Sequence, residues 1–178
     1  MDINPSEIIL RPFNLTDVDD LMLFFGDDRV TQNLRQKTLT SIDEALTFIK
    51  DVCIPHPWRR SICISGHSIG FISVFPGSNQ EDKYRAFIGY GVAPQYWGQG
   101  VATQALKIAV PLAFKDFPDL IRLQALVFVE NKGSQMVLEK AGFQKEGLLR
   151  KYSFVKGVLR DLYIYNFLST DISSPEEK

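Results

Sequence analysis

Hydrophobic and polar positions along the chain follow first a helical period and later patterns typical of strands. Near the amino end, the apolar run from Ile8 to Leu10 predicts a short strand that ends at Pro12. Apolar residues at helical spacing follow, and Thr16 can cap the helix that they predict. The apolar face of this helix consists of Val18, Leu21, Met22 and Phe25.

A second helix is predicted behind the segment Ser41-Ile42-Asp43-Glu44, which has the form of a capping box. In such a box, the side chains of the first and fourth residues each accept a hydrogen bond from the other residue's amide. The apolar stripe of this helix consists of Ala45, Phe48, Ile49 and Val52.

The segments 61–64, 69–74 and 84–92 have the composition of strands. Ser65-Gly66-His67-Ser68 separates the first two and predicts a hairpin turn, whereas the polar segment 76–82 predicts a loop. The third strand contains Gly89 and Gly91, and glycine inside a strand often marks a bulge.

The second half alternates helices and strands. We expect a loop over 93–99, a helix over 100–114 that Pro111 kinks or shortens, and a buried strand over 120–128. A helix over 132–141, closed by Gly142, precedes strands over 144–154 and 159–167 that are joined near Lys156-Gly157. The complete order predicts a mixed α/β sheet with helices packed on it.

The length, composition and charge of the chain limit the class of protein to which it can belong. The 178 residues fit one domain, which we expect to span 8–168, with a disordered tail over 169–178. Apolar residues make up 45% of the chain, which is enough to build a core. Lys plus Arg is 20 and Asp plus Glu is 21, so no basic surplus indicates nucleic-acid binding. No apolar run is long enough to cross a bilayer, so no membrane partner is expected.

The ends and the cysteines bear on location. The start Met1-Asp2-Ile3-Asn4-Pro5 has neither a basic region nor an apolar stretch, so we expect no secretory signal. Cys53 and Cys63 match no metal or redox spacing and are expected to be buried free thiols in a reducing compartment. These features predict a cytoplasmic protein, with a nuclear location as the alternative.

The most informative segment is the glycine-containing loop and helix start from Gly98 to Thr103. The first amides of a helix have no partner within it, and the helix dipole adds partial positive charge there. Small residues at 98, 100 and 102 allow an anion to approach the backbone, so the segment suits a phosphate or pyrophosphate. It matches neither a dinucleotide fingerprint nor a P-loop.

The run Tyr96-Trp97-Gly98-Gln99-Gly100-Val101-Ala102-Thr103-Gln104-Ala105 resembles the acetyl-CoA signature of the GNAT superfamily, in the branch that contains the RimJ/RimL type. Three other blocks carry the same resemblance, which covers about residues 8 to 168. They are Leu10-Arg11-Pro12-Phe13, Asn131-Lys132-Gly133-Ser134 with the following Val137–Phe143, and Gly157 with Arg160-Asp161.

The resemblance implies a GNAT-like fold whose strands 84–92 and 120–128 diverge, with the pantetheine arm of acetyl-CoA in the gap. Backbone groups near Val92 would pair with this arm, and Gly89 and Gly91 would form a bulge where the divergence starts. Asn131 would bind the arm or hold the opposite wall. The amides expected to hold the pyrophosphate belong to Gly98, Gln99, Gly100, Val101, Ala102 and Thr103.

Some positions depart from the superfamily pattern. Trp97 stands where many members have Gln or Arg, and we interpret it as a packing residue. Leu138 stands in place of a tyrosine that can protonate the departing thiolate, which leaves Ser134 as the substitute hydroxyl or as a helix cap behind Asn131. Phe87 replaces a frequent glutamate, so an obvious general base is absent.

The amine that attacks the thioester must lose a proton. The candidate bases are Glu81, Asp82, Glu130 and Asp161, acting directly or through water, and ordered water alone is the alternative.

The sequence therefore predicts an acetyl-CoA-dependent N-acetyltransferase that acts on a primary amine. We expect the acceptor to be a protein or peptide N-terminal α-amine. The alternatives are a small amine, such as a polyamine, amino sugar or drug, and a CoA-binding module without turnover. The composition does not select among the acceptors, and it does not indicate an oligomeric state.

Overall fold

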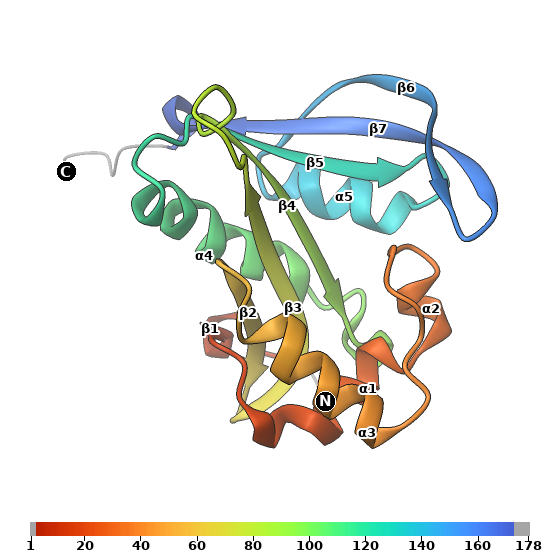
Figure 1. The fold of residues 1–178 in the computed structure, drawn as a ribbon. Coiled ribbons are helices and arrows are strands. Elements are labelled where there is room, and N and C mark those ends of the chain that lie inside the picture. Colours follow the sequence, from red (N-terminus) through yellow and green to blue (C-terminus); the bar gives the residue numbers. More distant parts are fainter. Residues whose placement is uncertain (1–2, 173–178) are drawn as a thin grey trace.

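The computed structural model describes residues 3–172, and within them a seven-stranded sheet with strand order β1-β2-β3-β4-β5-β7-β6 forms the centre (Figure 1). Strands β4 and β5 run parallel, and the other neighbouring strands pair antiparallel. The prediction of a mixed α/β sheet is confirmed. The strands are β1 (Ile9–Arg11), β2 (Arg59–Ile64), β3 (His67–Pro76), β4 (Arg85–Val92), β5 (Arg122–Phe128), β6 (Gln144–Val155) and β7 (Val158–Leu168).

Helices cover both faces of the sheet and create two clusters of buried side chains. Phe71 of β3 packs with α1 and α3 in one cluster, whereas its neighbour Ile72 packs with α4 and α5 in the other, because successive strand residues point to opposite faces. The helices are α1 (Val18–Phe25), α2 (Asp28–Thr31), α3 (Ile42–Phe48), α4 (Val101–Asp116) and α5 (Lys132–Lys140).

The start of α1 differs from the prediction, because Thr16 does not cap it. A 3-10 turn, Leu15–Asp17, leads into the helix, and Asn14 occupies the cap position of that turn. The buried carboxylate of Asp17 accepts from the Asn14 amide at 2.9 Å and from the Arg11 guanidinium at 2.6 and 2.8 Å. Thr16 donates only to the side chain of Asn14, at 3.0 Å.

Helix α3 begins at the predicted cap, where the Ser41 hydroxyl accepts from the Glu44 amide at 3.1 Å. The Glu44 carboxylate accepts from the Thr40 amide at 2.7 Å. A π-helical segment, Ile49–Cys53, follows α3 and widens the turn. The apolar stripe consequently shifts by one residue: Cys53 is 2% exposed, and Val52, predicted to be buried, is 39% exposed.

The predicted bulge at Gly89 and Gly91 is wrong. The β3–β4 register is continuous from Gly70 opposite Val92 to Pro76 opposite Ala86. Position 91 requires glycine for packing instead, because a Cβ there would lie 2.7 Å from the ring of Phe71.

Helix α4 continues through Pro111 to Asp116, so the proline does not shorten it. Pro111 lies on the exposed side of the helix, where water can hydrate the carbonyl that lacks a partner. The left-handed conformation predicted for Gly142 is confirmed by its φ of 94°. The hairpin turn at Lys156 and Gly157 is confirmed as well, with φ values of 50° and 80°.

The structure describes only the first part of the segment 169–178, which was predicted to be a disordered tail. Ser169–Asp171 form a 3-10 turn, and the Ser169 amide donates to the Ile121 carbonyl at 2.9 Å. Residues 173–178 lie outside the described part of the chain. Among residues 3–172, no helix is both long and apolar enough to cross a membrane.

Candidate active site

Strands β4 and β5 pair only at one end and then separate, as expected. Their register runs from Arg85 opposite Arg122 to Phe87 opposite Gln124, and no pairing follows (Figure 1). The rest of β4 therefore has one free edge that faces the gap between the two strands.

The β3–β4 register identifies the backbone groups on that free edge. The Ala93 amide donates to the Ile69 carbonyl at 2.9 Å, so alternate residues of β4 direct their amides and carbonyls toward β3. Tyr90 and Val92 alternate with these residues, so their backbone amides and carbonyls point away from β3 and into the gap. Their amide groups are placed where an extended ligand chain could pair with them as a neighbouring strand does.

Helix α4 begins beside the carboxyl end of β4, and its first turn lacks a cap. Gly98 and Gly100 adopt left-handed φ values of 75° and 78°, which turn the chain into the helix. No side chain caps α4 and no acidic residue lies in its first turn, in contrast to Ser41 and Asn131, which cap α3 and α5. The amides of Val101, Ala102 and Thr103 consequently present partial positive charge without a side-chain acceptor among residues 3–172.

Two side chains of the loop before α4 also bond to the backbone. Trp97 is 49% exposed rather than packed in the core, and its indole N–H donates to the Val92 carbonyl at 2.7 Å. Gln99 donates its side-chain amide to the Gln95 carbonyl at 2.9 Å. Its Oε1 is buried without a partner among the described residues, so this loop retains an unused acceptor.

The opposite wall of the gap is the start of α5, directly after β5. The Asn131 side chain caps this helix, because its Oδ1 accepts from the Ser134 amide at 3.1 Å. The capping role therefore belongs to Asn131. The Ser134 hydroxyl lies 2.7 Å from the Tyr90 hydroxyl, which reaches across from β4. The Tyr90–Ser134 contact thus links β4, whose free edge includes Val92, to the start of α5, which Asn131 caps. The gap between the separating strands β4 and β5, beside this helix start, is called the cleft below.

Tyr90 is a residue to which the sequence patterns assign no role. Burial raises the pKa of its hydroxyl, so the phenol is protonated at neutral pH. A signal for it exists in the sequence, because Tyr90 lies between two glycines in the strand that precedes the Gly98–Gly100 loop.

Two of the expected bases, Glu81 and Asp82, lie far from this cleft. They occupy the loop before Arg85, at the end of β4 where the strand pairs with β5. Seven residue steps along the strand separate Arg85 from Val92, which corresponds to about 23 Å. The Asp82 carboxylate also pairs with Arg85 at 2.5 Å. Neither residue can take a proton from an amine beside Val92.

The other two candidates lie near the start of α5. The Asp161 carboxylate accepts from the Lys151 amide at 2.7 Å and thereby supports the left-handed φ of 47° at Lys151. Glu130, next to Asn131, is mostly exposed and lies 4.0 Å from the Arg160 guanidinium. Glu130 and Asp161 are thus the two carboxylates near the start of α5. Among the described residues, a backbone amide donates to the carboxylate of Asp161 but none donates to that of Glu130.

The hairpin formed by β6 and β7 reaches the segment between α2 and α3. Arg35 donates to the Ser153 hydroxyl at 2.9 Å, and the Lys156 ammonium donates to the Thr31 carbonyl at 2.6 Å. Figure 1 shows α2 beside the end of this hairpin, with the diverging strands β4 and β5 nearby. These two bonds hold α2 and the residues that follow it against the β6–β7 hairpin.

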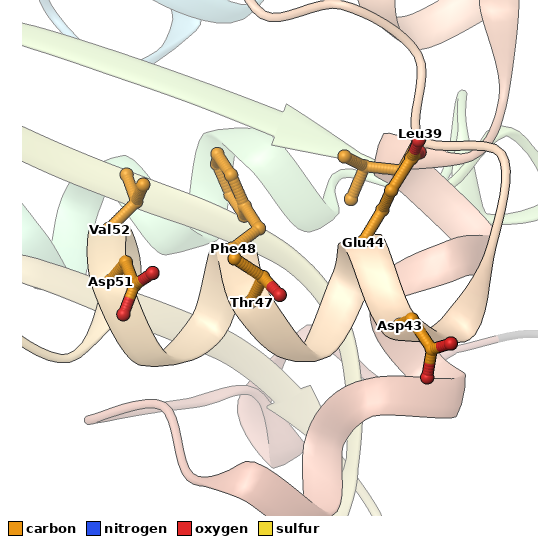
Figure 2. Close-up of a pocket in the computed structure, with 7 residues that line it drawn as sticks. All are labelled: Leu39, Asp43, Glu44, Thr47, Phe48, Asp51 and Val52. Atoms are coloured by element: carbon orange, nitrogen blue, oxygen red, sulfur yellow. The ribbon is translucent and has the colours of Figure 1, made fainter.

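A hollow on the outer side of α3 is unrelated to this cleft. It has a volume of about 410 Å³, and Figure 2 shows side chains of α3, its π-helical extension and Leu39 around it. Helix α3 packs with Phe71, on the sheet face opposite α4. The residues that line it are Leu39, Asp43, Glu44, Thr47, Phe48, Asp51 and Val52.

The fold is thus a mixed sheet whose parallel strands separate beside an uncapped helix start, an arrangement that can hold an extended anionic ligand. A family model described as "Acetyltransferase (GNAT) domain" matches residues 7–144, and the protein belongs to this family. It is therefore an acetyl-CoA-dependent N-acetyltransferase.

Two of the relatives described next span nearly the whole chain, and a third matches a shorter part of it. An uncharacterized N-acetyltransferase of Bacillus subtilis, YoaA, is 30% identical over 172 residues, which cover 93% of this chain and 96% of YoaA. The structure of Mycobacterium smegmatis RimJ in complex with CoA-disulfide is 26% identical with a TM-score of 0.76, over 94% of this chain and 84% of RimJ. Spermidine N(1)-acetyltransferase of Escherichia coli is 34% identical over 70 residues, 39% of this chain and 37% of that enzyme.

Proposed function

We propose that the protein transfers the acetyl group to the α-amine of a peptide or protein N-terminus. The observation that carries the site is the free edge of β4 at Tyr90 and Val92, which lies beside the uncapped start of α4. One element offers amides to an extended amide-containing chain, and the other offers amides to an anion. Acetyl-CoA contains both features in one molecule.

Each candidate residue then has a defined task. Val92 pairs through its backbone with the pantetheine arm, and Asn131 holds the opposite wall through its cap of α5. Ser134 supplies a hydroxyl proton near the site of bond cleavage. The amides that bind the pyrophosphate are those of Gly98, Gln99, Gly100, Val101, Ala102 and Thr103.

The acetyl transfer requires one group that accepts a proton from the amine and one that donates a proton to the departing sulfur. Acetyl-CoA supplies an activated acyl group as a thioester. A C–N bond forms and a C–S bond breaks, so one proton leaves the amine and one reaches the sulfur. Amides on the free edge of β4 can stabilise negative charge on the carbonyl oxygen, and Ser134 can donate to the sulfur. Glu130 or water accepts the proton of the amine, whose free pKa of about 8 makes a strong base unnecessary.

Charge on the β6–β7 hairpin and on the segment that it contacts favours a peptide over a polyamine. Segments 27–38 and 150–161 together with Glu130 contain seven basic and four acidic residues, and this excess of positive charge would repel a polycation. The RimJ relative spans most of this chain, whereas the similarity to the spermidine enzyme covers 39% of it. The residues counted are Arg29, Arg35, Lys37, Arg150, Lys151, Lys156, Arg160, Asp27, Asp28, Glu130 and Asp161.

Thiol release from acetyl-CoA with matched acceptors tests this assignment. The panel contains peptides with a free α-amine and no lysine, the same peptides with a blocked N-terminus and one internal lysine, and spermidine with an amino sugar. We expect release with the free N-termini, and mass spectrometry should locate the acetyl group on the α-nitrogen. Turnover that is confined to the small amines would refute the peptide assignment and support the alternative acceptor.

A further inference from the structure

The Tyr90–Ser134 contact joins the two walls of the cleft through hydroxyl groups. The hydroxyl oxygens lie 2.7 Å apart, and the Tyr90 hydroxyl is also 3.2 Å from the Ser134 carbonyl oxygen. A phenol has one proton, so it can make one of these two bonds well. Which bond it makes decides what the Ser134 hydroxyl proton can do.

If the phenol donated to the Ser134 carbonyl, the serine proton would be drawn to the phenol oxygen and would be unavailable to a thiolate. The Ser134 carbonyl faces the amide four residues further along α5, but its second lone pair could still accept from the phenol, so the lengths of the two contacts decide between them. The carbonyl contact is the longer of the two, whereas 2.7 Å is typical of a good O–H···O bond.

We propose that Tyr90 is a positioning residue that donates its proton to the Ser134 hydroxyl oxygen and so keeps the serine proton available to the cleft. This inference rests on the proposed role of Ser134 as the donor to the departing sulfur. Tyr90 contributes no net proton to the products, because any proton that it passes to the serine oxygen after Ser134 has donated is replaced from solvent.

A structural tie between β4 and α5 would explain the same distance, so the test must separate the two roles. We would measure kcat and the KM for acetyl-CoA for Tyr90→Phe, Ser134→Ala and the double variant. Tyr165→Phe is the matched control, because Tyr165 is also buried and its hydroxyl donates to Glu139 of α5 at 2.9 Å. Thermal unfolding and CoA binding establish that each variant is folded.

We expect Ser134→Ala to lower kcat by about 100-fold, within the range for loss of a general acid. Tyr90→Phe should lower kcat by about tenfold, corresponding to one lost hydrogen bond, with the KM for acetyl-CoA within about twofold of the parent. The double variant should match Ser134→Ala, because a positioning residue has no effect once its target is absent. Tyr165→Phe should retain the parental kcat.

The outcomes distinguish this inference from the function on which it rests. Parental kcat in Ser134→Ala would remove the role of Ser134, whereas slow Ser134→Ala with parental Tyr90→Phe would overturn the role of Tyr90 alone. Independent losses that multiply in the double variant would also overturn it.

If Tyr90→Phe does not fold, site-specific 3,5-difluorotyrosine at position 90 retains the ring and the donor and is more acidic. The inference requires kcat to fall at a lower pH than in the parent, as the fluorinated phenol ionises. The same substitution at position 165 is the control. If the pH profile of kcat with difluorotyrosine at position 90 matched those of the parent and of this control, the inference would be overturned.

Discussion

The indole N–H of Trp97 donates to the carbonyl oxygen of Val92 at 2.7 Å. This bond ties the loop before α4 to the last residue of β4. It therefore fixes the spacing between the free strand edge and the helix start, the two elements proposed to hold one extended ligand. The half-exposed ring contributes through this bond more than through burial.

Replacement of Trp97 by phenylalanine removes the donor and keeps an aromatic ring. We expect the Kd for CoA to rise about two- to tenfold, which corresponds to about 0.5–1.5 kcal/mol for one net hydrogen bond. Isothermal titration calorimetry measures the affinity, and thermal unfolding shows whether the fold is retained. An unchanged Kd in a folded variant would mean that the loop keeps its position without the indole.

Gly100→Glu tests the anion site at the start of α4. A carboxylate there should repel the pyrophosphate, and about 1–4 kcal/mol of repulsion at about 4 Å corresponds to a roughly 5- to 1,000-fold weaker affinity. Gly66→Glu is the matched control, because Gly66 also has a left-handed φ, 85° against 78°, in the turn between β2 and β3.

Both variants carry the strain of a left-handed side chain and the same added charge, so only the position differs. The site assignment predicts that Gly66→Glu binds CoA like the parent. If folded Gly100→Glu retained parental affinity, the pyrophosphate would have to lie elsewhere.

The second half of the fold is predictable from the sequence because its signals are local. The strand periods, the left-handed glycine at 142, the turn near Lys156-Gly157 and the loop before α4 depend on neighbouring residues, and the structure places them as expected. The splayed pair β4 and β5 was implied by a family resemblance, and its register confirms it.

Several of the errors concern features that no local sequence pattern marks. The π-helical segment after Phe48 changes which residues face the core, and the capping pattern at Ser41 gives no sign of it. The role of Gly91 depends on the ring of Phe71, which is twenty positions away in the sequence and adjacent in the sheet. The Tyr90–Ser134 contact likewise spans 44 positions, so no local pattern could reveal it.

Gly91→Ala tests the packing explanation for the glycine in β4. The added methyl would lie 2.7 Å from the Phe71 ring, which stacks on Phe25 at 4.7 Å between centroids and has little room to move. We expect a loss of about 1–3 kcal/mol in the free energy of unfolding, as is typical of an overpacked core.

Gly89→Ala is the control in the same strand, because its nearest neighbour would be the exposed Phe75 at 3.9 Å. This variant should unfold within about 0.5 kcal/mol of the parent in urea, like an ordinary surface substitution. Equal losses at 89 and 91 would show that glycine is needed for the strand conformation and not for contact with Phe71.

The ion pair between Arg11 and Asp17 should make stability depend on acid pH. Burial acts to raise the pKa of Asp17, but hydrogen bonds from Arg11 and from the Asn14 amide outweigh it, so the pKa lies below its ordinary value. A lowered pKa in the folded state stabilises the fold above the unfolded pKa of about 3.9, and this contribution is lost as pH falls through the folded value.

Asp17→Asn should therefore destabilise the protein by about 1–3 kcal/mol at pH 7, because the amide cannot replace all three charge-assisted bonds. The difference from the parent should shrink as the pH falls below about 4, where Asp17 of the parent also becomes neutral. Urea unfolding at pH 7 and pH 3 measures the difference in stability between the parent and the variant at each pH.

Asp27→Asn is the comparison, because Asp27 pairs with Arg29 on the surface and its pKa is lowered mainly by that side chain. Solvent screens the Asp27 pair, so its variant should show the smaller pH dependence, and a gap for Asp17→Asn that stays constant down to pH 3 would show that the ion pair contributes no net stability.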